Sequence, residues 1–155
     1  MTYYDLIPGK RYVRRLAGAV LALGLVAGAA SEAHALKVYT AIGDSITWGY
    51  PYGNSWAWPS RTGQTIYNRG VGGETTSAGL SRIQKVINNT NPTHLIIMFG
   101  TNDVNGPSDV NGSARNIRDM AQICHDNFVI PIVLTIPPFV GPKASLNSRV
   151  IEYNS

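Results

Sequence analysis

The stretch LKVYTAIGDSIT, residues 36–47, decides how the chain folds. Apolar and β-branched residues dominate residues 36–42 and predict a strand, which the glycine at position 43 ends. A tight turn directly after a strand exposes its side chains at the end of the sheet, where enzymes present a nucleophilic serine. Ser45 is therefore the first candidate catalytic residue, and such a serine needs a histidine nearby to take its proton.

Beyond this first strand, the sequence alternates between strand and helix patterns. Apolar side chains recur at helical spacing in residues 77–89, and residues 95–99 form the continuous apolar run of a strand buried on both faces. Further strands are predicted at residues 65–68 and 129–136, and further helices at residues 55–61, 113–126 and 146–153, with Ser55 and Ser113 as N-caps. Pro131 within the last strand indicates either the start of that strand or a strand at a sheet edge. This alternation predicts an α/β fold with a parallel sheet.

The first 35 residues have the pattern of a signal peptide. Four basic residues within residues 10–15 precede an apolar run at residues 16–30, and Ala33 and Ala35 match the small-x-small pattern of a cleavage site. The apolar run has 15 residues, which is short for a bilayer core, so cleavage is favoured over a permanent anchor. We therefore expect a signal peptide at 1–35, a protein that is periplasmic or secreted, and no stable membrane span after cleavage.

The remaining residues, 36–155, are enough for one domain with one hydrophobic core. They carry nine basic and seven acidic side chains, a formal charge of +2, which argues against a nucleic-acid partner. The single cysteine, Cys124, excludes an internal disulfide. Its place on the apolar face of a predicted helix indicates a buried, inert thiol.

Three polar loops follow the carboxyl ends of predicted strands. They contain Gly43-Asp44-Ser45, residues 70–75 and Gly100-Thr101-Asn102-Asp103. In a parallel sheet these ends meet at one edge, where α/β proteins bind their ligands. The hydroxyl of Ser45 can attack a carbonyl there. A glycine N–H and the amide of Asn102 can bind the oxyanion that forms.

At these residues the chain resembles the SGNH hydrolases, also called the GDSL lipase/esterase family, which is named for a Ser, a Gly, an Asn and a His in four sequence blocks. Residues 43–46 are similar to the first block, residues 68–75 to the second and residues 100–103 to the third. The resemblance implies that Ser45 is the nucleophile and that Gly73 and Asn102 are oxyanion donors. It also implies a three-layer flavodoxin-like fold, no metal or other cofactor, and hydrolysis of carboxylic esters or thioesters.

The fourth block of the family, Asp-x-x-His, has no counterpart in this sequence. His94 opens a predicted strand and His125 closes a predicted antiparallel helix, so both are expected at the end of the sheet far from Ser45. We therefore expect a hydrolase domain that is incomplete at its C-terminus. It would lack the fifth strand, the last helices and the catalytic His and Asp of the family, and would be near-inactive as it stands.

The other polar residues of these loops are interpreted as structural. Asp44 adjoins Ser45, so we expect it to stabilise the turn rather than to orient a base. Asp103 is interpreted as a turn residue and Glu74 as part of its loop.

The aromatic residues after the serine leave the substrate open. Trp48, Tyr50 and Tyr52 either rim a pocket for a sugar or an acyl group, or pack their own loop. The predicted function is an exported serine esterase that hydrolyses acyl or acetyl esters, of small molecules or carbohydrates, through an acyl-enzyme. The alternatives are a carbohydrate acetylesterase and a non-catalytic pseudoenzyme or binding domain.

Overall fold

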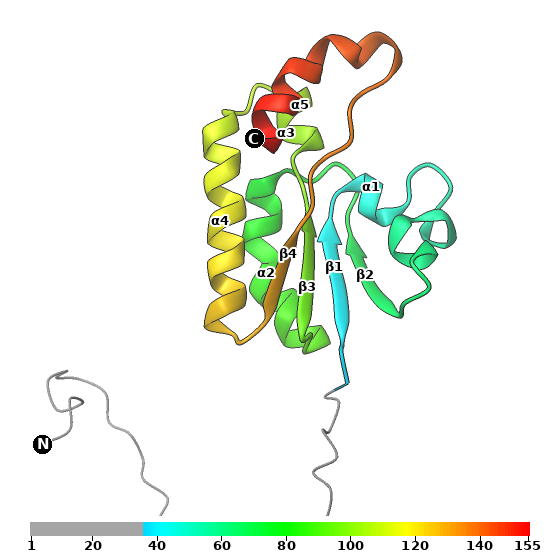
Figure 1. Ribbon diagram of the computed structural model, residues 1–155, viewed down its shortest axis with the longest axis vertical. Coiled ribbons are helices and arrows are strands. Elements are labelled where there is room, and N and C mark those ends of the chain that lie inside the picture. The colour runs from blue at the N-terminus through cyan, green and yellow to red at the C-terminus, as the bar shows by residue number, and fades with distance from the viewer. Residues whose placement is uncertain (1–35) are drawn as a thin grey trace, which may run out of the picture. The chain divides into compact units, whose positions relative to one another are not determined.

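A four-stranded parallel sheet organises the molecule. The computed structural model describes residues 36–155, so the predicted signal peptide lies outside the described residues. The strands are β1 (Tyr39–Gly43), β2 (Ile66–Gly70), β3 (His94–Met98) and β4 (Ile130–Val133). They lie in the order β2-β1-β3-β4, and every neighbouring pair is parallel (Figure 1). The predicted α/β fold with a parallel sheet is therefore confirmed.

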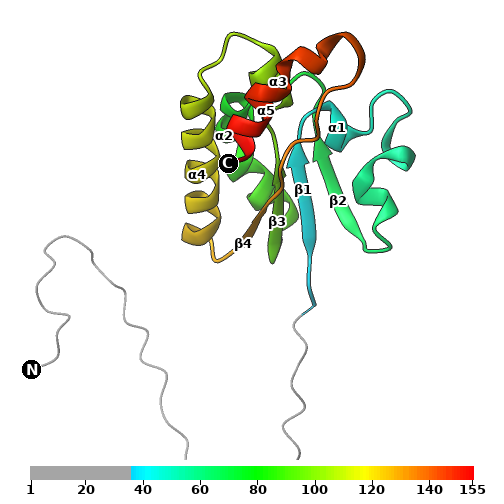
Figure 2. The same cartoon turned by 45° about the horizontal axis from the view of Figure 1, so that its top comes forward.

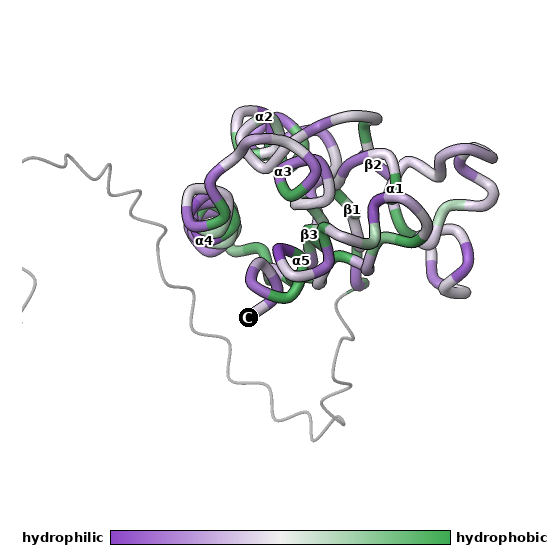
Figure 3. The backbone as a smooth tube through the Cα atoms, turned by 90° about the horizontal axis from the view of Figure 1, so that it is seen from above, coloured by the Kyte–Doolittle hydropathy of each residue, from purple (hydrophilic) through white to green (hydrophobic). Residues whose placement is uncertain are grey.

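Helices connect these strands and cover the sheet. The α-helices are α1 (Ser45–Trp48), α2 (Thr76–Thr90), α3 (Thr101–Asn105), α4 (Val110–Asp126) and α5 (Asn147–Asn154), and the 3₁₀ helices are η1 (Asn54–Trp56), η2 (Trp58–Arg61) and η3 (Gly141–Leu146). Seen from above, α2 lies on one side of the sheet and α5 on the other (Figure 3). The helices α3 and α5 lie above the carboxyl ends of β3 and β4 (Figure 2). The segment between α1 and β2 projects beside β2.

The predicted helix at residues 55–61 is replaced by η1 and η2, which are separated by Ala57. Pro59 explains the break, because it has no N–H to donate to the carbonyl of Ser55, four residues earlier. Ser55 therefore lies inside η1 and does not cap a helix. Pro59 itself is buried.

The helix predicted at residues 113–126 begins earlier, at Val110. Asp109 is its N-cap and accepts hydrogen bonds from the N–H groups of Asn111 and Gly112 at 3.1 and 2.9 Å. The prediction of Ser113 as N-cap is wrong, because Asp109, an equally good capping residue, precedes it and the helix begins one turn earlier. Ser113 is instead buried within the helix.

The main hydrophobic core lies between the sheet and the pair of helices α2 and α4. Its fully buried members include Ile42 and Leu95 from the strands, Ile83 from α2 and Met120 from α4. Cys124 belongs to the same core, and burial raises the pKa of its thiol to about 11. The predicted inert thiol is consistent with this position.

β4 is an edge strand of the sheet, which is one of the two positions that Pro131 indicated. It is shorter than expected and ends at Val133, although the N–H of Leu134 still donates to the carbonyl of Ile97 at 2.9 Å. The side chains of Ile130 and Val133 are about half exposed. No helix in residues 36–155 is long and apolar enough to cross a membrane.

Two asparagines fasten the segment between β4 and α5. The side chain of Asn154 accepts from the N–H of Ile136 and donates to its carbonyl, both at 3.0 Å. Asn147 makes the same pair of bonds to Phe139, at 2.8 and 3.0 Å. These bonds hold α5 above the carboxyl ends of the strands.

Candidate active site

Ser45 occupies the first position of α1, directly beyond the carboxyl end of β1. Asp44 is the N-cap of this short helix, and its Oδ1 accepts a hydrogen bond from the N–H of Ile46 at 2.9 Å. Gly43 permits the arrangement, because a Cβ there would collide with the side chain of Thr47. The close approach of α1 to β1 thus leaves Ser45 half-buried at the edge of the sheet.

Asp44 has the structural role that the sequence predicted. Its side chain is buried, and this burial raises the pKa of the carboxyl above its usual value of 3.8, although the hydrogen bond from Ile46 acts in the opposite direction. The negative charge of Asp103 also raises it. The second oxygen of Asp44 and the hydroxyl of Thr101 are buried without a hydrogen-bond partner among residues 36–155.

The loop after β2 is attached to the turn that carries Ser45. The N–H of Val71 donates to the carbonyl of Gly43 at 2.9 Å. Gly73 has a φ of +81°, and a Cβ there would meet no atom within 4 Å. The backbone conformation, and not a lack of space, is therefore what favours glycine at this exposed position.

Arg82 of α2 joins the same loop to the ends of two strands. Its Nε donates to both carboxylate oxygens of Glu74, at 2.9 and 2.8 Å. Its Nη2 donates to the carbonyl of Arg69 at 2.9 Å and to that of Gly43 at 3.4 Å. This clamp confirms a structural role for Glu74, and the sequence prediction missed Arg82, which lies eight residues further along the chain.

Asn102 contacts the same loop from the opposite side. It lies in the first turn of α3, beyond β3, and its Nδ2 donates to the carbonyl of Glu74 at 2.7 Å. Because Glu74 follows Gly73, this bond brings the second and third sequence blocks together. One N–H of the Asn102 amide is occupied by the loop, and the other has no hydrogen-bond partner among residues 36–155.

The strand order brings the three loops to one place. β1 lies between β2 and β3, so the chain leaves β1 toward one neighbour and later returns to the other side. This is the topological switch point at which open α/β sheets bind ligands. The loops that carry Ser45, Gly73 and Asn102 follow three adjacent strands at this point.

Asp103 is more than the turn residue that the sequence indicated. Its buried carboxylate accepts from the N–H and the hydroxyl of Thr76, at 2.9 and 2.7 Å, and from the hydroxyl of Ser113 at 2.9 Å. The carboxylate therefore ties the start of α2 and of α4 to α3. Thr76 follows the Gly-rich loop in sequence, but no local pattern pairs it with residue 103.

Tyr153 packs against the start of α3 from α5. Its hydroxyl donates to the carbonyl of Phe99 at 2.9 Å, and a Cβ on Gly100 would collide with its ring. Gly100 also has a φ of +126°. Burial raises the pKa of Tyr153 above its ordinary value, and the charges of Asp103 and Asp44 add to the shift.

Neither histidine in the described part of the chain lies near Ser45. His94 is paired in register with Tyr39, at the amino end of β1, and their rings are 4.9 Å apart. The four residues from there to Gly43 span about 13 Å of strand. His125 lies in the last turn of α4, just before β4, and so belongs to the same distant end.

The described residues also contain no cluster of three or more His, Cys, Asp or Glu side chains that could hold a metal ion. The groups at this edge include the hydroxyl of Ser45, backbone N–H groups and the amide of Asn102. Such a set can attack a carbonyl carbon and bind the oxyanion that results.

An open depression of about 410 Å³ lies beside α1 and β2. Its lining residues are Trp48, Asn54, Asn68, Arg69, Gly70, Val71 and Arg82. Tyr50 and Tyr52, which the sequence grouped with Trp48, are not in its wall and are 72 % and 73 % exposed. Trp58 packs inward, and its Nε1 donates to the hydroxyl of Thr47 at 3.4 Å.

A second cavity, of about 240 Å³, lies between α4, β4 and α5.

The chain matches the model of a known protein family. The model of the GDSL-like lipase/acylhydrolase family matches residues 41–155, which include all three loops.

Two curated proteins are similar in sequence. An uncharacterized lipoprotein, YqeF of Bacillus subtilis, is 35 % identical over 95 residues, which are 54 % of this chain and 39 % of that protein. An arylesterase of Vibrio mimicus is 27 % identical over 115 residues, which are 67 % of this chain and 58 % of that protein. The matches thus span 39 % and 58 % of the length of these curated relatives.

A solved structure shows the same fold. A lipolytic protein of the G-D-S-L family from Desulfitobacterium hafniense superposes with a TM-score of 0.69 at 26 % sequence identity. The superposition covers 77 % of this chain and 68 % of that one.

Proposed function

The chain belongs to the GDSL-like lipase/acylhydrolase family, and from this premise we propose that it hydrolyses carboxylic esters with Ser45 as the nucleophile. The hydroxyl oxygen attacks the ester carbonyl, the alcohol leaves, and water then releases the acyl group from the serine. Small-molecule and carbohydrate esters are the proposed substrates. The arylesterase similarity supports an ester, but not a particular acyl or alcohol group.

The observation that carries this proposal is the contact between Asn102 and the Gly73 loop. The 2.7 Å bond from Asn102 to Glu74 places an amide next to the backbone of Gly73, at the edge where Ser45 begins α1. In the proposed mechanism, the N–H groups of Ser45 and Gly73 and the second amide N–H of Asn102 bind the tetrahedral oxyanion. Donors held in place before the reaction stabilise the charge as it forms.

Proton transfer from Ser45 needs a general base, and residues 36–155 place no histidine near it. We propose that the 155-residue chain is therefore slow, retaining only the rate that binding and the oxyanion donors supply. Loss of the base in a serine hydrolase costs several orders of magnitude but leaves a residual rate above that of water, roughly 10³-fold.

Export is part of the same proposal. The signal-peptide pattern supports it, and so does the similarity to a protein named as a lipoprotein. Mass spectrometry of the protein recovered from a bacterial host tests it. An N-terminus at Leu36 is expected, and an uncleaved N-terminus contradicts the proposed signal peptide.

The catalytic proposal is tested by p-nitrophenyl acetate hydrolysis with and without added imidazole, which can substitute for a missing base. The unmodified chain should show a slow rate that imidazole increases beyond its own background. Ser45→Ala keeps the oxyanion donors, so without imidazole it should share this slow rate, and with imidazole it should gain no more than the imidazole background. Ser77→Ala, at an exposed serine of α2, should behave like the unmodified chain in both conditions. Equal rates for Ser45→Ala and the unmodified chain in both conditions would show that Ser45 is not the nucleophile.

A further inference from the structure

We propose that the surface formed by Trp48, Tyr50, Tyr52 and Trp56, together with the depression beside it, binds a polysaccharide. The ester hydrolysed at Ser45 would then be an acyl group, such as an acetyl group, carried on that polysaccharide. The substrate class rests on the proposed function, whereas binding of the sugar chain does not. We call these four residues the aromatic surface.

The first observation is the exposure of the aromatic surface. Trp48 is 45 % exposed, Trp56 is 60 % exposed, and Tyr50 and Tyr52 exceed 70 %. Within this segment the fold buries smaller groups instead, such as Ala57 and Pro59. Exposed apolar side chains that occur in groups are typical of interaction surfaces, and these four aromatic residues lie within nine consecutive positions.

The depression adds hydrogen-bonding groups next to these rings. Trp48 forms one wall, and Asn54, Asn68 and Arg69 line the rest with amide and guanidinium groups. Its volume of about 410 Å³ is in the range of small-molecule sites. Sugar rings have an apolar face of C–H groups and a rim of hydroxyls. An aromatic wall beside polar side chains matches both features.

Hydrogen bonds within the protein fix the wall of the depression. The Nδ2 of Asn68 donates to the carbonyl of Thr47 and to the Oδ1 of Asn54, both at 2.7 Å. Its Oδ1 accepts from the N–H of Gly70 at 2.9 Å. Asn68 therefore fixes the protein side of the depression and orients Asn54. The Nδ2 of Asn54 has no hydrogen-bond partner in the described part of the chain and is available to a hydroxyl.

Two residues of the aromatic surface contact each other. The rings of Tyr52 and Trp56 lie 5.8 Å apart, and the guanidinium of Arg61 lies 4.9 Å from the ring of Trp56. A cation–π contact at an exposed site contributes about 0.5–1 kcal/mol to keeping such a pair together. A sugar that stacks on these rings would therefore remove less side-chain freedom than it would from rings without such contacts.

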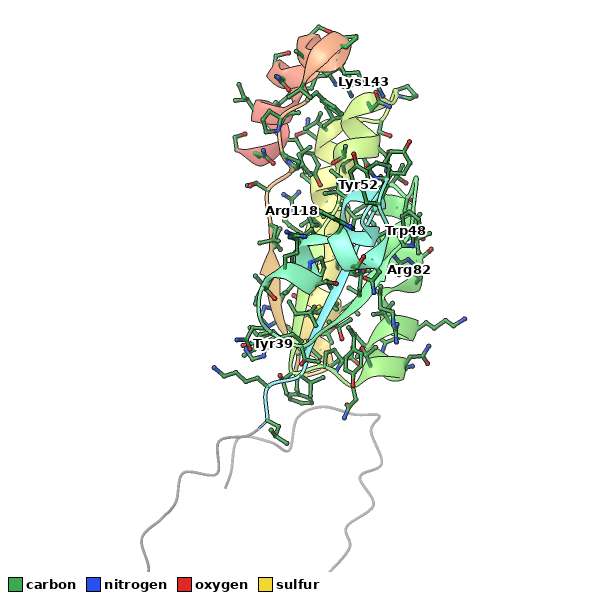
Figure 4. All side chains as sticks on the ribbon, turned by 90° about the vertical axis from the view of Figure 1, so that its right-hand side faces the viewer. Tyr39, Trp48, Tyr52, Arg82, Arg118 and Lys143 are labelled. Carbon is green, nitrogen blue, oxygen red and sulfur yellow. The ribbon has the colours of Figure 1, made fainter. Side chains whose placement is uncertain are left out.

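The depression lies close to the proposed nucleophile. Trp48 follows Ser45 by three residues in α1, which is a rise of about 4.5 Å along the helix. Val71, on the opposite side, belongs to the loop that carries Gly73. Figure 4 shows Trp48, Tyr52 and Arg82 on the face that is turned toward the viewer. A sugar bound there would present its acyl group at the switch point of the sheet.

The chemistry of residues 45–73 favours a polysaccharide over a lipid surface. This stretch contains no Asp, Glu or Lys, and Arg61 and Arg69 are its only charged residues. Of its aliphatic side chains, Val71 is the one that is largely exposed, at 43 %. Segments that lie in a membrane interface present a broad apolar face with large aliphatic side chains, besides aromatic and basic residues, and it is the exposed aliphatic side chains that this stretch lacks. Tyrosines, amides and glycines suit hydroxyl-rich ligands better.

The test measures binding by affinity electrophoresis in gels that contain soluble acetylated xylan or acetylated pectin. All proteins carry Ser45→Ala, so that no ester is consumed and the result does not depend on catalysis. Acetylated xylan is the neutral polysaccharide and acetylated pectin is the acidic one. Comparing the retardation by the two shows whether Arg61 and Arg69 favour a ligand with carboxylates. We expect retardation by at least one of them. The added substitutions Tyr52→Ala and Trp56→Ala should each weaken binding about tenfold, the loss expected for one aromatic contact.

Phe128→Ala is the matched control, because Phe128 is 96 % exposed and precedes β4 at the opposite end of the sheet. It should leave retardation unchanged, and circular dichroism should show that every variant is folded. The proposal is overturned if folded protein is not retarded by either polysaccharide, or if the two substitutions and the control behave alike. Binding to phosphatidylcholine–phosphatidylglycerol vesicles that depends on Trp56 would assign the aromatic surface to lipid instead. Failure of the esterase assay alone would leave the binding result standing.

Discussion

Replacing Arg82 with methionine removes a side chain that joins the turn before Ser45 to the loop that carries Gly73. Methionine keeps the apolar stem and deletes the guanidinium. The bonds lost are those to both oxygens of Glu74, at 2.9 and 2.8 Å, and to the carbonyl of Arg69, at 2.9 Å. The weaker bond to Gly43, at 3.4 Å, is lost as well.

The expected loss in the free energy of unfolding follows from this set of bonds. Hydrogen bonds to charged groups contribute about 1.5–3 kcal/mol each, and breaking a fully buried ion pair costs about 3–5 kcal/mol. The Arg82 and Glu74 side chains are 20 % and 17 % exposed, so water partly replaces what is removed. We therefore expect Arg82→Met to lower the free energy of unfolding by about 2–3 kcal/mol.

Urea unfolding of the full chain, followed by circular dichroism, measures this loss. Arg115→Met is the control, since Arg115 pairs with Asp109 at 3.6 Å with both side chains more than 60 % exposed. Exposed pairs contribute less than about 1 kcal/mol, so this variant should remain close to the unmodified chain. Arg82→Lys, which keeps the charge but not the planar fork, should recover less than half of the loss. If Arg82→Met and Arg115→Met lose the same amount, the clamp is not what stabilises these loops.

Three further substitutions or reagents test other parts of the site. Burial raises the pKa of Asp44, so its contribution to stability is complete below pH 3.8 and is lost as the pH rises through the raised value. Asp44→Asn keeps an oxygen that accepts from Ile46. Its free energy of unfolding should therefore rise relative to that of the unmodified chain as the pH increases from 3 to 7. If the difference between the two free energies does not change with pH, the pKa of Asp44 is not raised. Gly100→Ala should destabilise the fold by more than about 2 kcal/mol, because the positive φ and the ring of Tyr153 both oppose a Cβ at this position. A variant with the same melting temperature as the unmodified chain would refute this. Cys124, with a pKa of about 11, should not react with Ellman's reagent at pH 8 until urea unfolds the chain, and rapid labelling of the native protein would show that it is not buried.

The local elements were largely predictable because they depend on residues that are close in sequence. The four strands and the helices α2 and α4 follow from apolar spacing, whereas the helix predicted at residues 55–61 is two 3₁₀ helices instead. Pro131, which has no N–H to donate, indicated that β4 starts there or lies at an edge, and β4 is an edge strand. Helix starts were harder, because capping residues compete. Asp109 displaced Ser113 as a cap, and the hydroxyl of Ser113 then became available to Asp103. The hydrogen bond of Ser113 depends on a carboxylate ten residues earlier in the chain, and the spacing of apolar residues carries no information about such a partner.

The candidate site shows the same division. Ser45, Gly73 and Asn102 could be assigned from the sequence because each lies just beyond a recognisable strand, and parallel strands end at one edge. The partners that hold these loops could not be assigned. Arg82 was missed because its bond to the carbonyl of Gly43 crosses 39 residues. Tyr153 was missed because its bond to Phe99 crosses 54 residues.

The sequence by itself therefore determined a parallel α/β fold and the chemical groups that collect at the carboxyl edge of its sheet. Both follow from the direction of the strands and from the turn after Ile42, which are local properties of the chain. The tertiary structure alone decided how those groups are held: by the Arg82–Glu74 clamp, by the buried Asp103 carboxylate and by α5 above the strand ends. It also decided that the aromatic residues after Ser45 face water, because exposure depends on which distant segments cover a side chain.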